Sequence, residues 1–201
     1  FGVINVAVVG ASRRFLAQIT RHQNEVKFMS GSLQYSDYSG AAQFVVPYEI
    51  IKETCAGSRA LLDQYIDSCK YSLQEYETAI ESGLNNDAAG YMMPQGLRNV
   101  LIISATPYQL KHMISQRICR RNTTETMYVM LLLWEALWPL SAMFRTGVGP
   151  SCVKHKCEEG KMSCCQPLMN ARIEKIMERD QCSVPIALIK DCFPFIERCK
   201  E

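Results

Sequence analysis

Two short stretches of the chain gather cationic and hydrogen-bonding side chains in a mixture that core packing does not require. The first holds Gln18, Arg21 and His22 and continues through Ser32 and Gln34. Such a mixture suits an anionic ligand with a planar ring, because arginine binds carboxylate and phosphate oxygens in pairs. A partly buried, hydrogen-bonded histidine is the ordinary interpretation of His22 alone. Gln18 adds to the case for a ligand, since it lies four residues earlier and can share a helix face with His22.

The second stretch pairs His112 with Arg117 on one predicted helix. Five residues separate them, so their side chains lie about 140° apart around the helix axis. They do not share one stripe, yet they could flank a ligand lying across the helix. Arg117 also clusters with Arg120 and Arg121 near the helix C-terminus, where the helix dipole favours cations. The spacing alone leaves two interpretations of these arginines open: favourable charges at a helix end, or ligand binding.

Several classes of protein are disfavoured by what the sequence does not contain. It has no G-x-G-x-x-G, P-loop, G-x-S-x-G or H-E-x-x-H motif, which argues against a Rossmann dehydrogenase and a simple NTPase. The net charge of +2 gives no argument for nucleic acid. The most apolar run, residues 127–140, contains Glu135 and is shorter than the ~20 residues of a membrane span. We therefore expect a buried helix there, with neither nucleic acid nor membrane as a partner.

The elements that must position these side chains follow from periodicity and capping residues. In the first half we expect a strand at 1–9 that Gly10 ends, and a helix from the Ser12 cap to about 22. A loop with a short extended piece should follow at 23–42, and then a short strand at 44–46. A helix is expected at 48–82, interrupted near Gly57 and capped by Gly83. In the second half we expect a short helix capped by Asn86 or Asp87, a strand at 97–104, a helix at 107–119 capped by Thr106, a helix from 123 or 124 to about 144 affected by Pro139, and helices at 169–179 and after Pro185.

This order predicts an α/β protein of the α+β type, with a mixed or antiparallel sheet flanked by long helices. We expect one domain at 1–150, ending in a Gly-rich linker, and a Cys-rich extension at 151–201. The chain begins inside an apolar run, so we expect further sequence upstream. No signal peptide is visible.

The chain has ten cysteines, of which Cys55 and Cys69 lie in helical sequence. Free cysteine behaves there as a small apolar residue, so we expect a reducing compartment, the cytoplasm. Four more follow the pattern Cys152-x4-Cys157-x6-Cys164-Cys165. This spacing departs from the C-x2-C pairing of most zinc sites, so free thiols or a disulfide are expected, with zinc as the alternative. We assign no metal ligands.

Four motifs in order, followed by a C-terminal ending, resemble those of the flavin-dependent thymidylate synthases. Arg21-His22 followed by Ser32-x-Gln34-Tyr35 resembles the signature Arg-His-Arg, spacer, Ser-x-Arg-Tyr. Residues 88–94 resemble Ala-Arg-x-x-Leu-Pro, and residues 112–117 resemble His-Phe-Leu-x-x-Arg. Residues 119–125 resemble the stretch that ends in Gln-x-Glu-Ile, and residues 149–164 resemble a C-terminal ending of some members. The resemblance covers about residues 1–165, and the Glu-His segment that helps members hold flavin would lie upstream.

The resemblance implies a homotetramer with FAD sites shared between subunits. Such enzymes take a methylene from methylenetetrahydrofolate and reduce it on dUMP to give dTMP, while NADPH reduces the flavin. The implied roles are FAD contacts for His22 and His112, a place at the junction of flavin and nucleotide for Arg21, and nucleotide contacts for Gln18, Ser32 and Gln34. Arg117 would lie against the pyrimidine and stabilise negative charge on its carbonyl oxygen.

The chain also departs from the family pattern where arginines are expected. The departures are Gln23, Gln34, Gly90, Thr106-Pro107-Tyr108 in place of Asn-x-Arg, and Thr123 in place of glutamine. Two lost charge-assisted bonds of about 1.5–3 kcal/mol each would weaken phosphate binding several hundredfold or more. Arg13, Arg98 and Lys111 are candidates to compensate. Otherwise the chain is a diverged paralogue acting on another pyrimidine nucleotide, or a non-catalytic subunit that keeps the fold.

Overall fold

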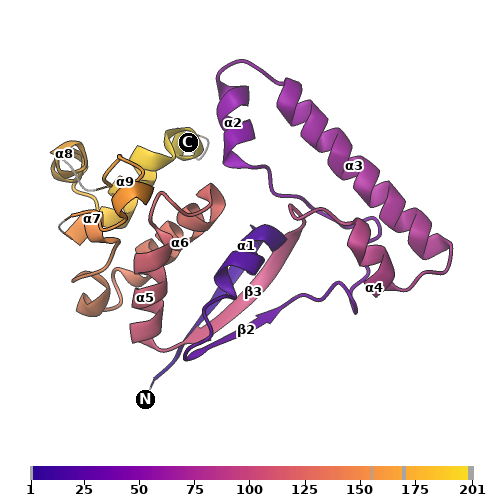
Figure 1. Cartoon of the computed structure of the whole chain (residues 1–201), viewed down its shortest axis with the longest axis horizontal. Helices are drawn as coiled ribbons and strands as arrows, with labels where there is room; N and C mark the ends of the chain where they lie inside the picture. The colour runs from indigo at the N-terminus through magenta and orange to yellow at the C-terminus, as the bar shows by residue number, and fades with distance from the viewer. Residues whose placement is uncertain (1, 155, 169–170, 199–201) are drawn as a thin grey trace. The chain divides into compact units, whose positions relative to one another are not determined.

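The structure is a computed structural model that describes residues 2–154, 156–168 and 171–198. The chain divides into two compact units, Ile4–Ser104 and Ala105–Glu201, the second of which also takes the first three residues. Each unit is described by itself below, with the element labels of Figure 1.

A small antiparallel sheet of three strands lies in the order β1-β3-β2. Its strands are β1 (Ile4–Ser12), β2 (Val26–Ser30) and β3 (Arg98–Ala105). The prediction that Gly10 ends the first strand is wrong, because β1 continues through Gly10 to Ser12. Gly10 has φ +93°, and a Cβ there would lie 2.9 Å from Arg98 Nε. Glycine therefore lets the strand continue beneath the Arg98 side chain.

Helix α1 (Arg13–Ile19) follows directly and carries Gln18. Its predicted cap is confirmed: the Phe15 N–H donates to Ser12 Oγ at 3.1 Å. Phe15 and Ile19 are fully buried, so the helix face that carries them packs against the interior. The helix ends earlier than expected, so His22 lies just beyond it and its backbone N–H donates to the Ile19 carbonyl at 3.2 Å.

The predicted interruption of the long helical segment is confirmed. Gly57 has φ +100° and separates α2 (Tyr48–Cys55) from α3 (Ala60–Glu81), and Gly83 follows α3 with φ +90°. The predicted strand at 44–46 is reduced to a single antiparallel bridge between Phe44 and Leu97. A short helix α4 (Asn86–Ala89) leads into the 3-10 helix η1 (Gly90–Met92). Its cap is Asn85, one residue before the predicted position, since the Ala88 N–H donates to Asn85 Oδ1 at 2.8 Å.

The second unit begins with α5 (Pro107–Arg117) and α6 (Thr124–Leu137). Thr106 caps α5 as predicted, accepting from the Gln109 N–H at 3.3 Å. Helix α6 is largely buried but ends well before residue 144, because Pro139 cannot continue it. The chain turns there into η2 (Ala142–Phe144), and Trp134 Nε1 donates to the Phe144 carbonyl at 2.7 Å. Among the described residues, no helix is both long and apolar enough to cross a bilayer.

The last part of the chain adds short helices to the same unit. They are α7 (Ser151–Lys154), η3 (Gly160–Met162), α8 (Ala171–Asp180), α9 (Val184–Cys192) and α10 (Pro194–Arg198). Helix α9 packs on α6, where the Tyr128 and Phe193 rings meet edge to face with centroids 5.0 Å apart. The domain boundary expected at residue 150 stays a prediction.

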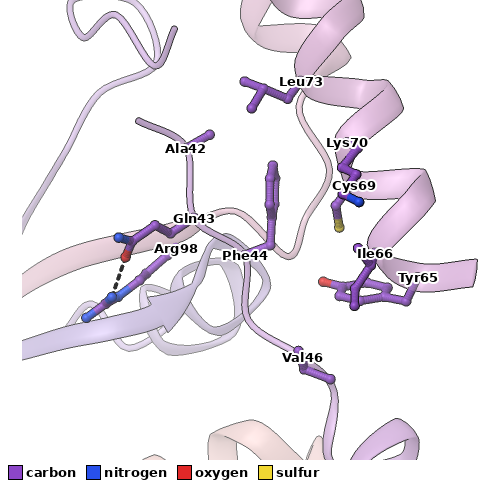
Figure 2. A pocket seen from close by; sticks show the side chains of 10 residues that line it. All are labelled: Ala42, Gln43, Phe44, Val46, Tyr65, Ile66, Cys69, Lys70, Leu73 and Arg98. Atoms are coloured by element: carbon purple, nitrogen blue, oxygen red, sulfur yellow. Dashed lines mark hydrogen bonds between the residues drawn. The ribbon is translucent and has the colours of Figure 1, made fainter. Parts of the chain in front are cut away.

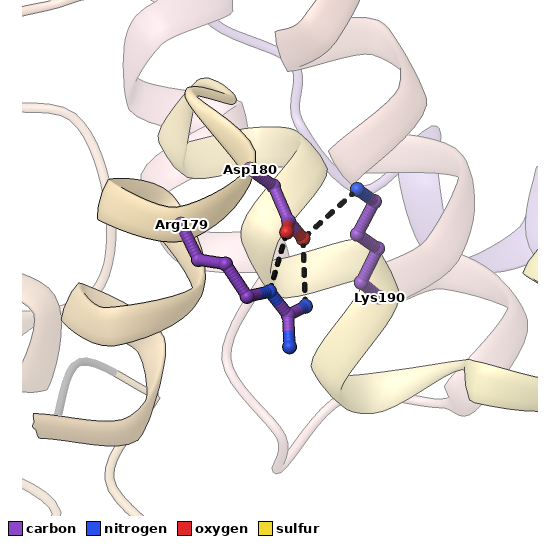
Figure 3. A network of polar contacts seen from close by, with 3 residues as sticks. All are labelled: Arg179, Asp180 and Lys190. Atoms are coloured by element: carbon purple, nitrogen blue, oxygen red, sulfur yellow. Dashed lines mark hydrogen bonds and ion pairs between the residues drawn. The ribbon is translucent and has the colours of Figure 1, made fainter.

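A polar network joins the end of α8 to α9 (Figure 3). Asp180 accepts from Arg179 Nε at 2.6 Å and from Lys190 Nζ at 3.2 Å. The hydrogen bonds from Arg179 lower the pKa of the Asp180 carboxyl to about 2. The network therefore stays charged across the physiological pH range.

Candidate functional site

His112 and Arg117 line one cavity of about 610 Å³ in the second unit. The two side chains thus border one space, as a ligand lying across the helix would require, and their roles stay predictions. His112 is exposed and Arg117 is half-buried. The remaining lining comes from Ser115, Gln116 and Cys119, and from the later residues Gly149, Pro150, Ser151, Cys152, Cys157, Glu158 and Glu159.

The guanidinium of Arg117 is held in place from the loop that follows α5. Its Nη1 donates to Asn122 Oδ1 at 3.2 Å. The amide of Asn122 in turn donates to the Gln116 carbonyl at 2.9 Å and to the Cys119 carbonyl at 3.3 Å. Asn122 therefore ties the C-terminus of α5 together and orients the arginine.

The far wall of this cavity depends on Gly149. Its N–H donates to Ser115 Oγ at 3.0 Å, which joins residues 149–159 to α5. Gly149 has φ +115°, and a Cβ there would lie 3.0 Å from Val153 Cβ. Only glycine fits this backbone without strain. The wall also brings Glu158 and Glu159 to the cavity, so its charge is not simply positive.

The first predicted stretch lies in the other unit. His22 is buried with 8% of its surface exposed, Arg21 is exposed, and Gln18 is half-buried on α1. Ser32 serves a local turn, since its Oγ accepts the Gln34 N–H at 3.1 Å. The nucleotide contact expected of Ser32 stays a prediction.

A cavity of about 400 Å³ borders this stretch at Gly31, and Tyr38, Arg98 and Asn99 also line it. It does not include Gln18, Arg21, His22, Ser32 or Gln34. Asn99 Nδ2 is buried without a hydrogen-bond partner in the described structure. Buried donors of this kind are costly to leave unpaired, so they mark places where a ligand could bind.

Sequence reasoning missed a further cavity of about 520 Å³ in the first unit (Figure 2). Phe44, Tyr65 and Leu73 give it apolar walls, and Lys70 and Arg98 also line it. The Tyr65 hydroxyl donates to the Val45 carbonyl at 2.7 Å, which fixes one wall. Tyr65 and Leu73 lie eight residues apart on α3, a spacing typical of one helix face, and no sequence signal distinguishes a cavity wall from a packed core.

Comparison with known proteins places the chain in a family. The profile described as "Thymidylate synthase complementing protein" (Thy1) matches residues 1–140. The chain belongs to this family. The matched region contains both predicted stretches, including His112 and Arg117.

Relatives in the Thy1 family are distant. A flavin-dependent thymidylate synthase of Thermococcus onnurineus is 24% identical over 170 residues, covering 80% of this chain and 66% of the relative. One from Pyrococcus abyssi is 23% identical over 122 residues, covering 59% of this chain and 48% of the relative. The chain thus spans between half and two thirds of these relatives' length. The expected family resemblance is confirmed, while activity does not follow from identity this low.

A solved structure confirms the fold. Thymidylate synthase X of Helicobacter pylori, determined with FAD and dUMP, matches with a TM-score of 0.52 at 21% sequence identity, covering 67% of each chain. This similarity confirms the predicted combination of a small sheet with long helices.

Several departures from the Thy1 family pattern have structural counterparts. Gly90 is fully buried, and a Cβ there would lie 3.2 Å from Leu33 Cβ. Leu33 thus lies where the first atoms of a side chain at position 90 would need space. Two of the candidate replacement cations are engaged: Lys111 Nζ donates to the Thr146 carbonyl at 2.7 Å, and Arg98 donates to Gln43. The third, Arg13, has a buried Nη1 without a hydrogen-bond partner in the described structure.

Proposed function

We propose that the chain is a flavin-dependent thymidylate synthase-like enzyme that carries out the reductive methylation of dUMP to dTMP. FAD is the proposed cofactor, and NADPH and methylenetetrahydrofolate are the proposed co-substrates. The observation that carries the proposal is the shared cavity of His112 and Arg117 within a region that matches the family. The fold's similarity to a thymidylate synthase solved with FAD and dUMP supports it.

Arg117 is the residue we assign to the chemistry. Asn122 holds its guanidinium at 3.2 Å, and a guanidinium is a donor suited to a pyrimidine carbonyl oxygen. A donor fixed before the reaction stabilises negative charge as it develops on that oxygen, and it needs no reorientation. Gln18, Ser32 and Gln34 would bind the nucleotide.

The charge of the cavity indicates which part of a ligand it takes. Glu158 and Glu159 share it with Arg117, and carboxylates repel a phosphate. They accept well from ring N–H groups and sugar hydroxyls. We therefore propose that this cavity binds the ring and sugar parts of the ligands rather than their phosphates.

For FAD, the residues present fit the anionic part of the group. Arg21 is exposed, and Arg13 Nη1 is a buried donor with an open hydrogen bond in the described structure. Both are suited to diphosphate oxygens, with His22 and His112 as the further proposed contacts. Bound FAD would supply the redox chemistry that no side chain can provide. A homotetramer and a cytoplasmic location belong to the same proposal.

A specific observation also favours a second candidate, a diverged paralogue acting on another pyrimidine nucleotide or a non-catalytic subunit. Leu33 lies against Gly90, where the family has an arginine. Lys111 is already hydrogen-bonded to Thr146, so it is a poor substitute. Weak dUMP binding with intact flavin binding is the signature of this candidate.

One assay separates the candidates. The purified chain is loaded with FAD and given NADPH, methylenetetrahydrofolate and dUMP labelled with tritium at the pyrimidine 5-position. Tritium release supports the synthase. Bound flavin without release supports the diverged paralogue, and a chain that retains no flavin contradicts both enzymatic candidates.

A further inference from the structure

A second cavity of the same unit is lined by five cysteines. It measures about 150 Å³, and the thiols of Cys119, Cys152, Cys157, Cys164 and Cys165 share its wall with Arg120 and Arg121. The sequence places these residues far apart, because Cys119 follows α5 and the others lie in the extension. The fold therefore gathers half of the chain's ten cysteines around one small space.

The described cysteines are all reduced in this structure. Burial raises the pKa of the Cys119 thiol, and the nearby Glu159, Cys152 and Cys164 raise it further. Among the described residues, no group of three or more His, Cys, Asp or Glu side chains is arranged to hold a metal ion.

We propose that this cluster is a site of reversible thiol oxidation, in which Cys119 forms a disulfide with Cys152 or Cys164. The oxidant is a low-molecular-weight disulfide such as oxidised glutathione. The Cys164 or Cys152 thiolate attacks one sulfur and releases one glutathione thiol. Cys119, after losing its proton to solvent, then displaces the second glutathione. Two protein thiols are oxidised, one disulfide is reduced to two thiols, and atoms and electrons balance.

The surroundings of the cluster supply a cation for the first step. Arg120 pairs with Asp191 at 3.0 Å, whereas Arg121 contacts the neutral sulfur of Met162 at 3.9 Å. A guanidinium in the wall of the cavity attracts the carboxylates of glutathione. The raised pKa of Cys119 makes it the slower partner, which suits the second step.

This site is coupled to the candidate active site by shared walls. Cys119, Cys152, Cys157 and Glu159 line both the thiol cavity and the cavity of His112 and Arg117. A bond from Cys119 to the segment that begins at Ser151 would fix that wall. Resting on the proposed function, we infer that oxidation weakens nucleotide binding about fivefold or more, the low end of couplings between linked sites.

The first test uses mass spectrometry and does not depend on nucleotide binding. The folded full chain is incubated with oxidised glutathione, alkylated and digested without reduction. We expect a linked peptide pair containing Cys119 and either Cys152 or Cys164. The variant Cys119→Ser should lose the pair, while Cys55→Ser, which removes an exposed thiol in the other unit, should keep it. If Cys119→Ser does not fold, Cys119→Ala serves the same purpose.

Three results would overturn the inference. They are glutathione adducts at single cysteines without a linked pair, a linked pair that persists without Cys119, and a native mass with one bound zinc that protects these thiols. The second test measures dUMP binding before and after oxidation, and again after reduction. If the disulfide forms and dUMP binding does not change, the coupling between the two cavities is contradicted and the disulfide itself is not. Absence of dUMP binding in the reduced chain counts against the proposed function and leaves the disulfide result intact.

Discussion

Removing the guanidinium at position 117 should weaken nucleotide binding more than any other single change in the second unit. Arg117 lines the cavity with His112 and donates to Asn122 at 3.2 Å. In Arg117→Ala a ligand oxygen loses one charge-assisted hydrogen bond, worth about 1.5–3 kcal/mol. The dissociation constant for dUMP should therefore rise by roughly 10- to 150-fold. Arg117→Lys keeps the charge but loses the planar fork, so an intermediate loss is expected.

The assay is isothermal titration of dUMP into the FAD-loaded chain, with thermal unfolding measured for each variant. Asn122→Ala is the matched control, because it removes the partner of Arg117 and keeps the charge. Its own loss should be about fivefold or less, because the guanidinium remains and only a residue that positions it is removed. Two results would refute the reasoning: Arg117→Ala that folds and binds dUMP within about threefold of the parent, or Asn122→Ala that loses as much as Arg117→Ala.

Three further predictions concern stability and reactivity. The pKa of Asp180 is about 2 in the folded chain, so this carboxylate stabilises the fold above its ordinary pKa near 3.8 and loses the effect as the pH falls toward 2. Asp180→Asn should therefore lower the melting temperature at pH 7 and flatten its change between pH 4 and pH 2. An acid profile that the substitution leaves unaltered would count against the network. Burial raises the pKa of Cys192 to about 11, so at pH 8 iodoacetamide should label it far more slowly than the exposed Cys55. Peptide mass spectrometry measures both labelling rates, and equal rates would contradict the burial of Cys192. Ser12→Ala removes the cap of α1 and should cost about 0.5–2 kcal/mol in urea unfolding, and a smaller loss would show that the cap bond to Phe15 is unimportant.

Local rules predicted much of the fold. Ser12 and Thr106 cap their helices as expected, since a side-chain oxygen before an apolar helical pattern accepts a free backbone N–H. Gly57 breaks the helical segment for a similarly local reason. The error at Gly10 has a tertiary cause, because the glycine makes room for Arg98 of another strand. No pattern within residues 1–12 contains that information.

The candidate site was predictable only in part. The helical spacing of His112 and Arg117 allowed one shared ligand, but the wall that closes the cavity comes from residues 149–159. Gly149 signals a turn without saying which helix the turn meets. The contact of Cys119 with the later cysteines is likewise a long-range product of the fold. Gln18, Arg21, His22, Ser32 and Gln34 were chosen by resemblance, and their roles stay predictions.

Flavin binding decides whether the chain can work as a flavoenzyme. The purified full chain is incubated with FAD, freed of unbound cofactor by gel filtration, and its absorbance spectrum is recorded. The account predicts retained flavin bands at about one FAD per chain, with Arg21→Ala in the family motif reducing that ratio. A folded chain that emerges colourless after FAD loading, with no flavin bands at any protein concentration, would contradict it.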